Sequence, residues 1–243
     1  MEKGFEMSAI KQDNNDSHLH HDHGHDHSHG HSLYSELMCH LPYAIFSVAF
    51  CLTILSFLGY VSLGVTDPKL LKKGAKTLFH SFHFLHIVFA GTGALITFFR
   101  FSKNVFKGLL VGIFCASVFC TLSDAIIPFL AGKLLGVHMH FHLCFLSELQ
   151  NILPFLVVGI INGLIMGKYH TASSGFYSLF SHFIHIFISS FASTFYLVSH
   201  GMSDWQSQIG IVFLFLVIAV VVPCTFSDVI IPMACARLGD KKG

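Results

Sequence analysis

Two copies of one short motif place an aspartate inside an apolar stretch of this chain. The stretch 120–128, CTLSDAIIP, returns as 224–232, CTFSDVIIP, with the acids at Asp124 and Asp228. An ionisable group inside a membrane costs on the order of 2.5–3.5 kcal/mol on insertion scales, so it usually has a partner and a function. The repeat therefore marks a candidate site in each half of the sequence.

A pair of histidines accompanies each aspartate. His83 and His86 belong to the sequence HFLHI, and His182 and His185 belong to HFIHI. Histidines three residues apart lie on one face of a helix, so each pair offers two neutral imidazole nitrogens to one cation. With an aspartate supplying negative charge, such a set is typical of a site for a divalent transition metal.

Cysteines and prolines add further donors to each motif. Cys120 and Cys224 precede the aspartates by four residues and share their helix face, where a soft thiolate favours zinc or another late transition metal over magnesium. Pro128 and Pro232 follow the aspartates by four residues and lack the N–H that a helix would use. Each aspartate is therefore expected to present a freed backbone carbonyl as well as its carboxylate.

A third duplicated motif and a segment of alternating histidines supply further candidate ligands. Ser-Glu-Leu occurs around both Glu36 and Glu148, and the alternating His138, His140 and His142 would point the same way in an extended loop. Three paired motifs recurring in the same order indicate a tandem duplication. A purely structural reading competes, with prolines kinking two helices, Ser and Asp bonding each other, and histidines packing among phenylalanines.

Composition indicates that these motifs lie in a membrane. The sequence is 53% hydrophobic, contains 27 Phe, is only 11% charged and has a mean hydropathy of +0.67. Six long apolar runs predict an all-α protein with six transmembrane helices, because each approaches the ~20 residues that a spanning helix needs. These runs are 41–64, 78–99, 106–131, 148–166, 177–199 and 208–235.

Three spans in each repeat have a geometric consequence. An odd number makes the second copy enter from the opposite side, which predicts a 3+3 inverted-topology repeat with the units 32–137 and 138–243. Lysines and arginines favour the face that carries both termini, so we expect both termini inside, with the bacterial inner membrane as the location. Counting depth from the ends of the apolar runs predicts two separate clusters, one near each surface.

A His-rich tail precedes the helices. Residues 1–31 are low-complexity and predicted to be disordered and metal-binding, with neither a basic n-region nor an apolar h-region of a signal peptide. Its imidazoles include His21, His23, His25, His27 and His29. Tails of this kind resemble those of cation diffusion facilitators and zinc-iron permeases, and the resemblance covers the tail alone. It implies zinc or nickel binding.

These observations favour a secondary transporter for a divalent transition metal, with Zn²⁺ first and Ni²⁺ or Co²⁺ also compatible, that alternates access between the two clusters. One alternative is a membrane b-type haem protein with His axial ligands, and another is a metal-sensing or accessory subunit that does not translocate. No enzyme is expected, since the His-box and metallopeptidase patterns are absent. The expected partners are metal ions and the lipid bilayer; a homodimer through the Phe-rich faces is compatible, and no nucleic acid is expected.

Overall fold

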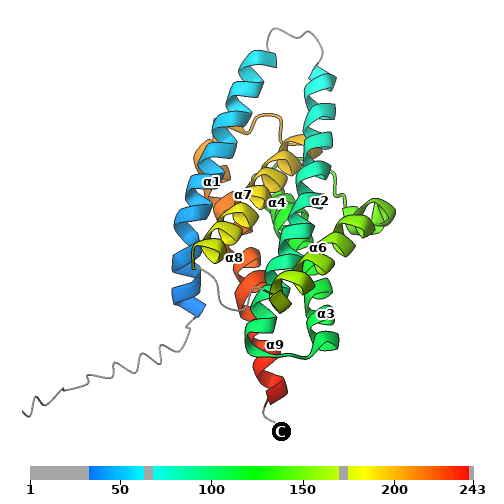
Figure 1. Ribbon diagram of the computed structural model, residues 1–243. Coiled ribbons are helices and arrows are strands. Elements are labelled where there is room, and N and C mark those ends of the chain that lie inside the picture. Colours follow the sequence, from blue (N-terminus) through cyan, green and yellow to red (C-terminus); the bar gives the residue numbers. More distant parts are fainter. Residues whose placement is uncertain (1–32, 63–67, 170–174, 241–243) are drawn as a thin grey trace, which may run out of the picture. The chain divides into compact units, whose positions relative to one another are not determined.

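The computed structural model describes residues 33–62, 68–169 and 175–240, and the part it describes is helical without strands (Figure 1). The predicted metal-binding tail, with its histidines, lies outside the described residues. The α-helices are α1 (Leu33–Ser62), α2 (Pro68–Phe101), α3 (Val105–Phe114), α4 (Ile127–Leu134), α5 (Cys144–Ser147), α6 (Leu149–Tyr169), α7 (Gly175–His200), α8 (Ile209–Thr225) and α9 (Ile231–Asp240). Shorter helical segments of other pitch are η1 (Cys115–Phe119), η2 (Leu122–Ile126), η3 (Gln206–Gln208) and η4 (Phe226–Ile230).

Six helices are long and apolar enough to cross a membrane, which confirms the predicted number of spans. The third span runs continuously through α3, η1, η2 and α4, and the sixth through η3, α8, η4 and α9. The spans are Glu36–Val61, Lys72–Phe101, Val105–Leu134, Leu149–Gly167, Ser181–His200 and Gln206–Leu238.

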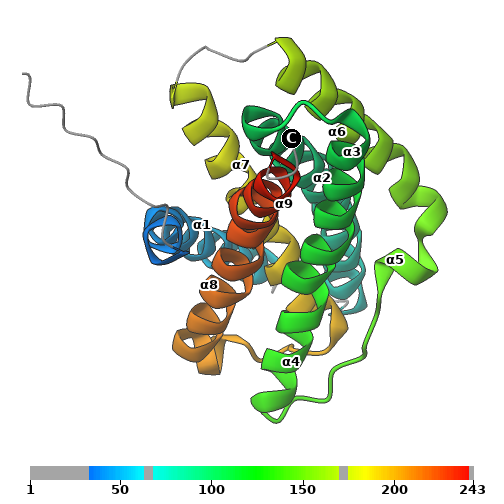
Figure 2. The ribbon, with the colours of Figure 1, turned by 90° about the horizontal axis from the view of Figure 1, so that it is seen from below.

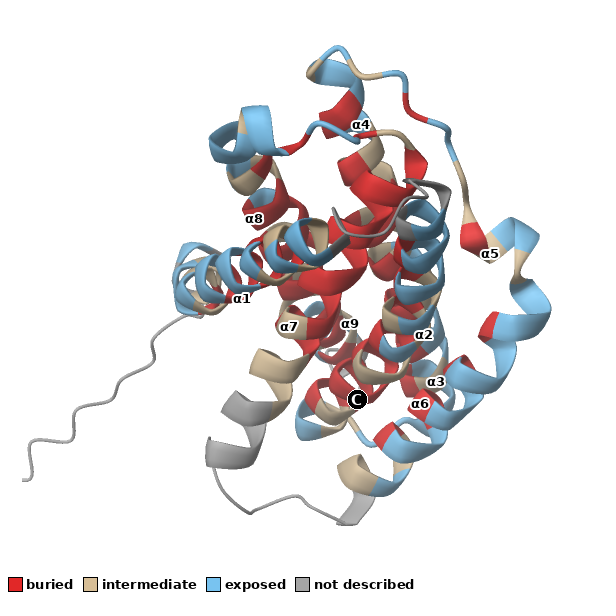
Figure 3. Cartoon of the chain, turned by 90° about the horizontal axis from the view of Figure 1, so that it is seen from above, coloured by how far each residue is buried: buried red, intermediate tan, exposed pale blue. Residues whose placement is uncertain are grey.

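The second and fifth spans, α2 and α7, form the centre of the bundle. In their most apolar windows 67% and 72% of the residues are buried, against 28–50% in the other four spans. The end-on views show α2 and α7 in the interior, with α1, α6 and α8 outside them (Figures 2 and 3). The two helices that carry the histidine pairs are therefore the two most shielded from lipid.

Large apolar side chains cover the outer faces of the peripheral helices. Phe46, Phe57, Phe106, Val158 and Leu214 are each more than two-fifths exposed. A soluble protein would not leave so many large apolar groups in contact with water, whereas a bilayer solvates them. This surface is the one expected of a chain in contact with lipid.

A row of glycines brings α6 against α2. A Cβ built on Gly159 would lie 2.7 Å from the Val88 backbone oxygen, and one on Gly163 would lie 2.8 Å from the Leu95 side chain. Thr92 Oγ1 donates to the Gly159 carbonyl at 3.1 Å across the same contact. Small residues spaced by four permit this close backbone approach. In lipid there is no hydrophobic driving force between helices, so close packing of this kind is what makes them associate.

Gly159→Ala should therefore destabilise the protein by about 1–3 kcal/mol, because the new methyl group meets backbone that cannot move aside. Thermal unfolding in detergent, followed by fluorescence of the buried Trp205, measures this. Gly74→Ala is the matched control, since a Cβ on Gly74 has nothing within 4 Å. Equal melting temperatures for the two variants would contradict the proposed contact.

Candidate metal centre

The first histidine pair and the first aspartate meet in the bundle interior. His83 and His86, on α2, place their Nδ1 atoms 2.9 Å and 2.7 Å from Asp124 Oδ2, on η2. All three side chains are at most 1% exposed. The sequence predicted this grouping from a shared level in the membrane, and the structure confirms the contact.

The second half repeats the arrangement atom for atom. His182 and His185, on α7, place their Nδ1 atoms 3.1 Å and 2.5 Å from Asp228 Oδ2, on η4. His185 and Asp228 are buried, whereas His182 is partly exposed. Each aspartate therefore uses a single carboxylate oxygen to hold two imidazoles.

The prediction of two separate clusters near opposite surfaces is wrong, because the clusters touch. His86 Nε2 lies 2.6 Å from His185 Nε2, and the ring centroids are 4.6 Å apart. The apolar run 78–99 covers only part of α2, so depth counted along that run places the histidines too near one surface. Helix α2 begins at Pro68, ahead of the apolar run, so that His86 lies near the middle of the helix.

A cysteine completes the central group. Cys224 Sγ lies 3.8 Å from His86 Nε2, and the donor atoms of His86, His185 and Cys224 all lie within 4.8 Å of one another. Of the two predicted cysteines, Cys224 belongs to this compact set.

The aspartates orient the imidazoles and leave the Nε2 atoms of the central pair facing each other. The sequence predicted Asp124 and Asp228 as metal ligands, but their Oδ2 atoms are occupied by His Nδ1 atoms. A carboxylate on one imidazole nitrogen fixes the tautomer and raises the ligand strength of the other nitrogen. In this geometry the aspartates act through His86 and His185.

Serines complete the environment of Asp124. Ser123 Oγ and Ser189 Oγ donate to Asp124 Oδ1 at 2.6 Å and 3.1 Å, so both carboxylate oxygens are hydrogen-bonded. Asp228 differs, because among the described residues its buried Oδ1 has no hydrogen-bond partner. A Cβ on Gly93 would lie 2.9 Å from that oxygen, which shows how closely the α2 backbone approaches it. The two halves thus share their His–Asp bonds but not their surroundings.

A wide turn precedes each proline. The Ile127 N–H bonds to the Leu122 carbonyl, five residues back, so η2 is π-helical. In that register Pro128 leaves the Ser123 carbonyl without a helical donor, one residue before the position that an α-helical count predicts. Ser193 Oγ, on α7, supplies the missing bond at 3.0 Å. The π-turn therefore ties the aspartate-bearing segment to the fifth span.

The lone pairs of the central histidines determine what this site can do. An ionised aspartate only accepts hydrogen bonds, so the Nδ1 atoms of His86 and His185 carry the protons. Both Nε2 atoms are then acceptors, and they face each other at 2.6 Å in a buried environment. Two acceptors at that distance repel unless a cation lies between them. The geometry calls for a proton or a metal ion at this point.

The remaining predicted residues lie away from the central pair. His138 and His140 are exposed on the segment between α4 and α5, and the His140 N–H donates to the His200 carbonyl at 2.9 Å. Glu148 accepts a hydrogen bond from Asn151 at 2.6 Å. Glu36 lies one turn before His40, and its backbone carbonyl accepts a hydrogen bond from His40 Nδ1 at 2.7 Å.

One group of side chains was not predicted from the sequence. His80 and Cys144 join the predicted His142 in a second set whose donor atoms all lie within 4.8 Å of one another. His80 precedes His83 by three residues, so extending the i, i+3 pattern by one step would have found it. His40, which the sequence grouped with His182 and Glu36 in the second half, contacts His182 edge-on, with ring centroids 5.3 Å apart.

No family model matches the sequence, and no curated protein or solved structure matches it. The chemistry of the site is therefore the basis for a function.

Ser193→Ala should lower the stability by about 1–3 kcal/mol, because it leaves the buried Ser123 carbonyl without a donor. Ser190→Ala is the matched control on the same helix: Ser190 is equally buried, and its hydroxyl bonds the Ile186 carbonyl of its own helix. Thermal unfolding of both variants in detergent measures the difference. A Ser193→Ala protein no less stable than Ser190→Ala would refute the role given to this bond.

Proposed function

We propose that this protein is a secondary transporter that carries a divalent transition-metal cation across a membrane, with zinc as the first candidate. The observation that carries the proposal is the pair of Nε2 atoms, one from each half of the chain, facing each other 2.6 Å apart beside Cys224. The metal is the substrate and binds to His86, His185 and Cys224.

The donor set suits tetrahedral zinc after a small movement. Ordinary Zn–N and Zn–S distances place two ligand nitrogens about 3.3 Å apart, and a nitrogen and a sulfur about 3.6 Å apart. His86 Nε2 and Cys224 Sγ are already 3.8 Å apart. The two imidazoles must separate by about 0.7 Å to admit the ion between them. Two imidazoles and one thiolate are borderline-soft ligands that favour zinc, cobalt or nickel over magnesium.

The two halves supply a mechanism for alternating access. Each contributes one long central helix, one His–His–Asp set and one π-turn before a proline. We infer that the halves are an inverted repeat of three spans each, whose pseudo-two-fold axis passes between His86 and His185. Rocking one half against the other would open the shared central site to each surface in turn, as in other inverted-repeat transporters. One central site thus replaces the two half-sites expected from sequence.

Further imidazoles lead away from the central pair on both sides. His83 and then His80 follow α2 in one direction, whereas His182 and His40 lie beyond Asp228 in the other. These groups give an ion intermediate partners in an otherwise apolar bundle. Because a metal and a proton compete for the same lone pairs, metal entry would displace protons, and proton antiport is the coupling that we infer.

The haem alternative fits this geometry less well. Axial histidines must bracket an iron and the porphyrin plane, whereas the facing Nε2 atoms are 2.6 Å apart with Cys224 beside them.

The Lys and Arg distribution favours both termini inside, with the bacterial inner membrane as the proposed location. In that orientation the His-rich tail would collect or buffer metal on the inner side.

Flux measurements on the full-length protein test the proposal. In proteoliposomes that contain a zinc-sensitive dye, wild-type protein should admit zinc, and His185→Gln should reduce the initial rate at least tenfold. Cys51→Ser is the control, because Cys51 is a buried thiol of α1 that belongs to neither metal-ligand group. Zinc bound at the central pair without flux would support an accessory or sensing role instead.

Asp124→Asn should weaken central metal binding about 10–100-fold, because it removes the charge that orients His86. Cobalt titration of Cys144→Ser protein measures this: the thiolate-to-cobalt absorption then reports Cys224 and Cys120, and residues 1–31 contain no cysteine. Asp204→Asn, the same change at an exposed turn, should leave the midpoint unchanged. An unaltered midpoint in Asp124→Asn would argue against this role for the carboxylate.

A further inference from the structure

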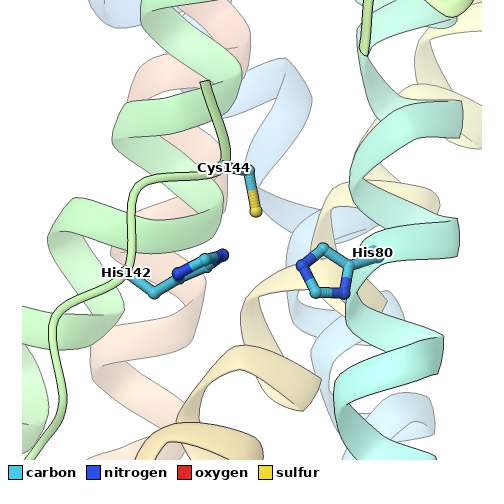
Figure 4. A group of neighbouring side chains, drawn as sticks. All are labelled: His80, His142 and Cys144. Atoms are coloured by element: carbon cyan, nitrogen blue, oxygen red, sulfur yellow. The ribbon is translucent and has the colours of Figure 1, made fainter. Parts of the chain in front are cut away.

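A second cluster of metal-ligating side chains lies outside the central site. His80 comes from α2, His142 from the segment between α4 and α5, and Cys144 from the first residue of α5 (Figure 4). Their side chains point into one space, and their donor atoms all lie within 4.8 Å of one another. Two stretches distant in sequence, one on α2 and the other at the start of α5, thus bring two imidazoles and a thiol together.

We propose that His80, His142 and Cys144 form a second binding site for a thiophilic divalent cation of the zinc class, at the end of the bundle that carries the α4–α5 segment. Two imidazoles and one thiolate leave a fourth tetrahedral position for water, for an incoming anion or for a group of the transport path. The site does not depend on transport through the central pair, because it shares no ligand with that pair.

One nitrogen in this cluster lacks a partner. His80 Nε2 is buried, and no hydrogen bond reaches it from the described residues. A buried polar atom left without a bond costs about 1–3 kcal/mol, so such atoms usually signal an absent ligand or ion. The neighbouring rings are those of His142, at 5.7 Å between centroids and nearly perpendicular, and of Phe79 and Phe84. A cation would satisfy this nitrogen.

The segment that carries His142 is held in place without a metal. The His142 N–H donates to Tyr196 Oη at 3.2 Å, and the His142 ring stacks on His200 at 5.5 Å. Gly201 has a φ of +144°, and a Cβ there would lie 2.6 Å from the His138 carbonyl oxygen. These contacts with the end of α7 fix the position of the ligand segment in advance, which lowers the entropy lost on binding.

The electrostatic surroundings suit a neutral imidazole. Burial and the neighbouring Lys76 lower the pKa of His142, which favours the neutral imidazole, and Ser147 Oγ lies 3.3 Å from its Nε2. Burial raises the pKa of the Cys144 thiol to about 12, so a metal must displace the thiol proton on binding. The negative charge of Glu148 acts on both His142 and Cys144 and offsets part of the effect of the Lys76 charge. The donor set of two imidazoles and one thiol therefore favours metals that bind thiolate strongly.

Cobalt titration with both central thiols removed tests the proposal. Full-length Cys120→Ser/Cys224→Ser protein should still develop thiolate-to-cobalt absorption, and adding Cys144→Ser should abolish it. Adding Cys39→Ser, which changes an exposed cysteine of α1, should leave it intact. His80→Ala in the same background keeps the thiol and should weaken binding about tenfold or more, as losing a direct ligand costs at least as much as losing an outer-shell partner.

Absence of the band from folded Cys120→Ser/Cys224→Ser protein, or its persistence after Cys144→Ser, would overturn the second site. If the background protein does not fold, the single Cys144→Ser change answers the question, since it must lower the wild-type band while Cys39→Ser does not. The central site is read separately, in Cys144→Ser protein. Failure of one site therefore leaves the result for the other intact.

Discussion

Two carboxylates buried in an apolar bundle are the constraint on which the rest of this structure depends. Asp124 and Asp228 are each at most 3% exposed, and an uncompensated charge at that depth is very costly. Each is stabilised by two imidazoles that donate to one of its oxygens. Because this use of Nδ1 fixes the orientation of each ring, it also directs His86 Nε2 and His185 Nε2 toward each other. The approach of these two nitrogens therefore follows from how the buried charges are compensated.

The same constraint explains local features that are costly by themselves. The π-turn at η2 opens the helix ahead of Pro128 and leaves the Ser123 carbonyl without a donor. Ser193 supplies that donor from α7, and Ser189 from the same helix donates to Asp124. A helix irregularity, a proline and two serines thus join the third span to the fifth. Irregular backbone at this depth is tolerated because it is buried in protein and its polar groups are bonded.

The division of labour among the spans follows from the position of the polar residues. Most of the buried polar side chains lie on α2 and α7, which occupy the centre, whereas the peripheral spans present phenylalanine, leucine and isoleucine outward. Glycines of α6 allow its backbone to lie directly against α2, so that a larger side chain at Gly159 or Gly163 would clash with α2. In the transport proposed above, whole helices would have to move, because His86 and His185 are both buried.

The sequence by itself determined the class of the fold, the number of spans and the partners of each aspartate. Long apolar runs predict membrane helices directly, and the duplicated His-x-x-His and Ser-Asp motifs identify groups that must compensate each other. Tertiary structure decided what no local pattern contains: the contact between His86 and His185, the use of the aspartates to orient imidazoles, and the joining of His80 and Cys144 to His142. These depend on where α2 begins, on a π-turn that shifts the register by one residue, and on the crossing of α2 and α7. The physical reason is that periodicity specifies a helix face, whereas depth and inter-helix distance are set by packing.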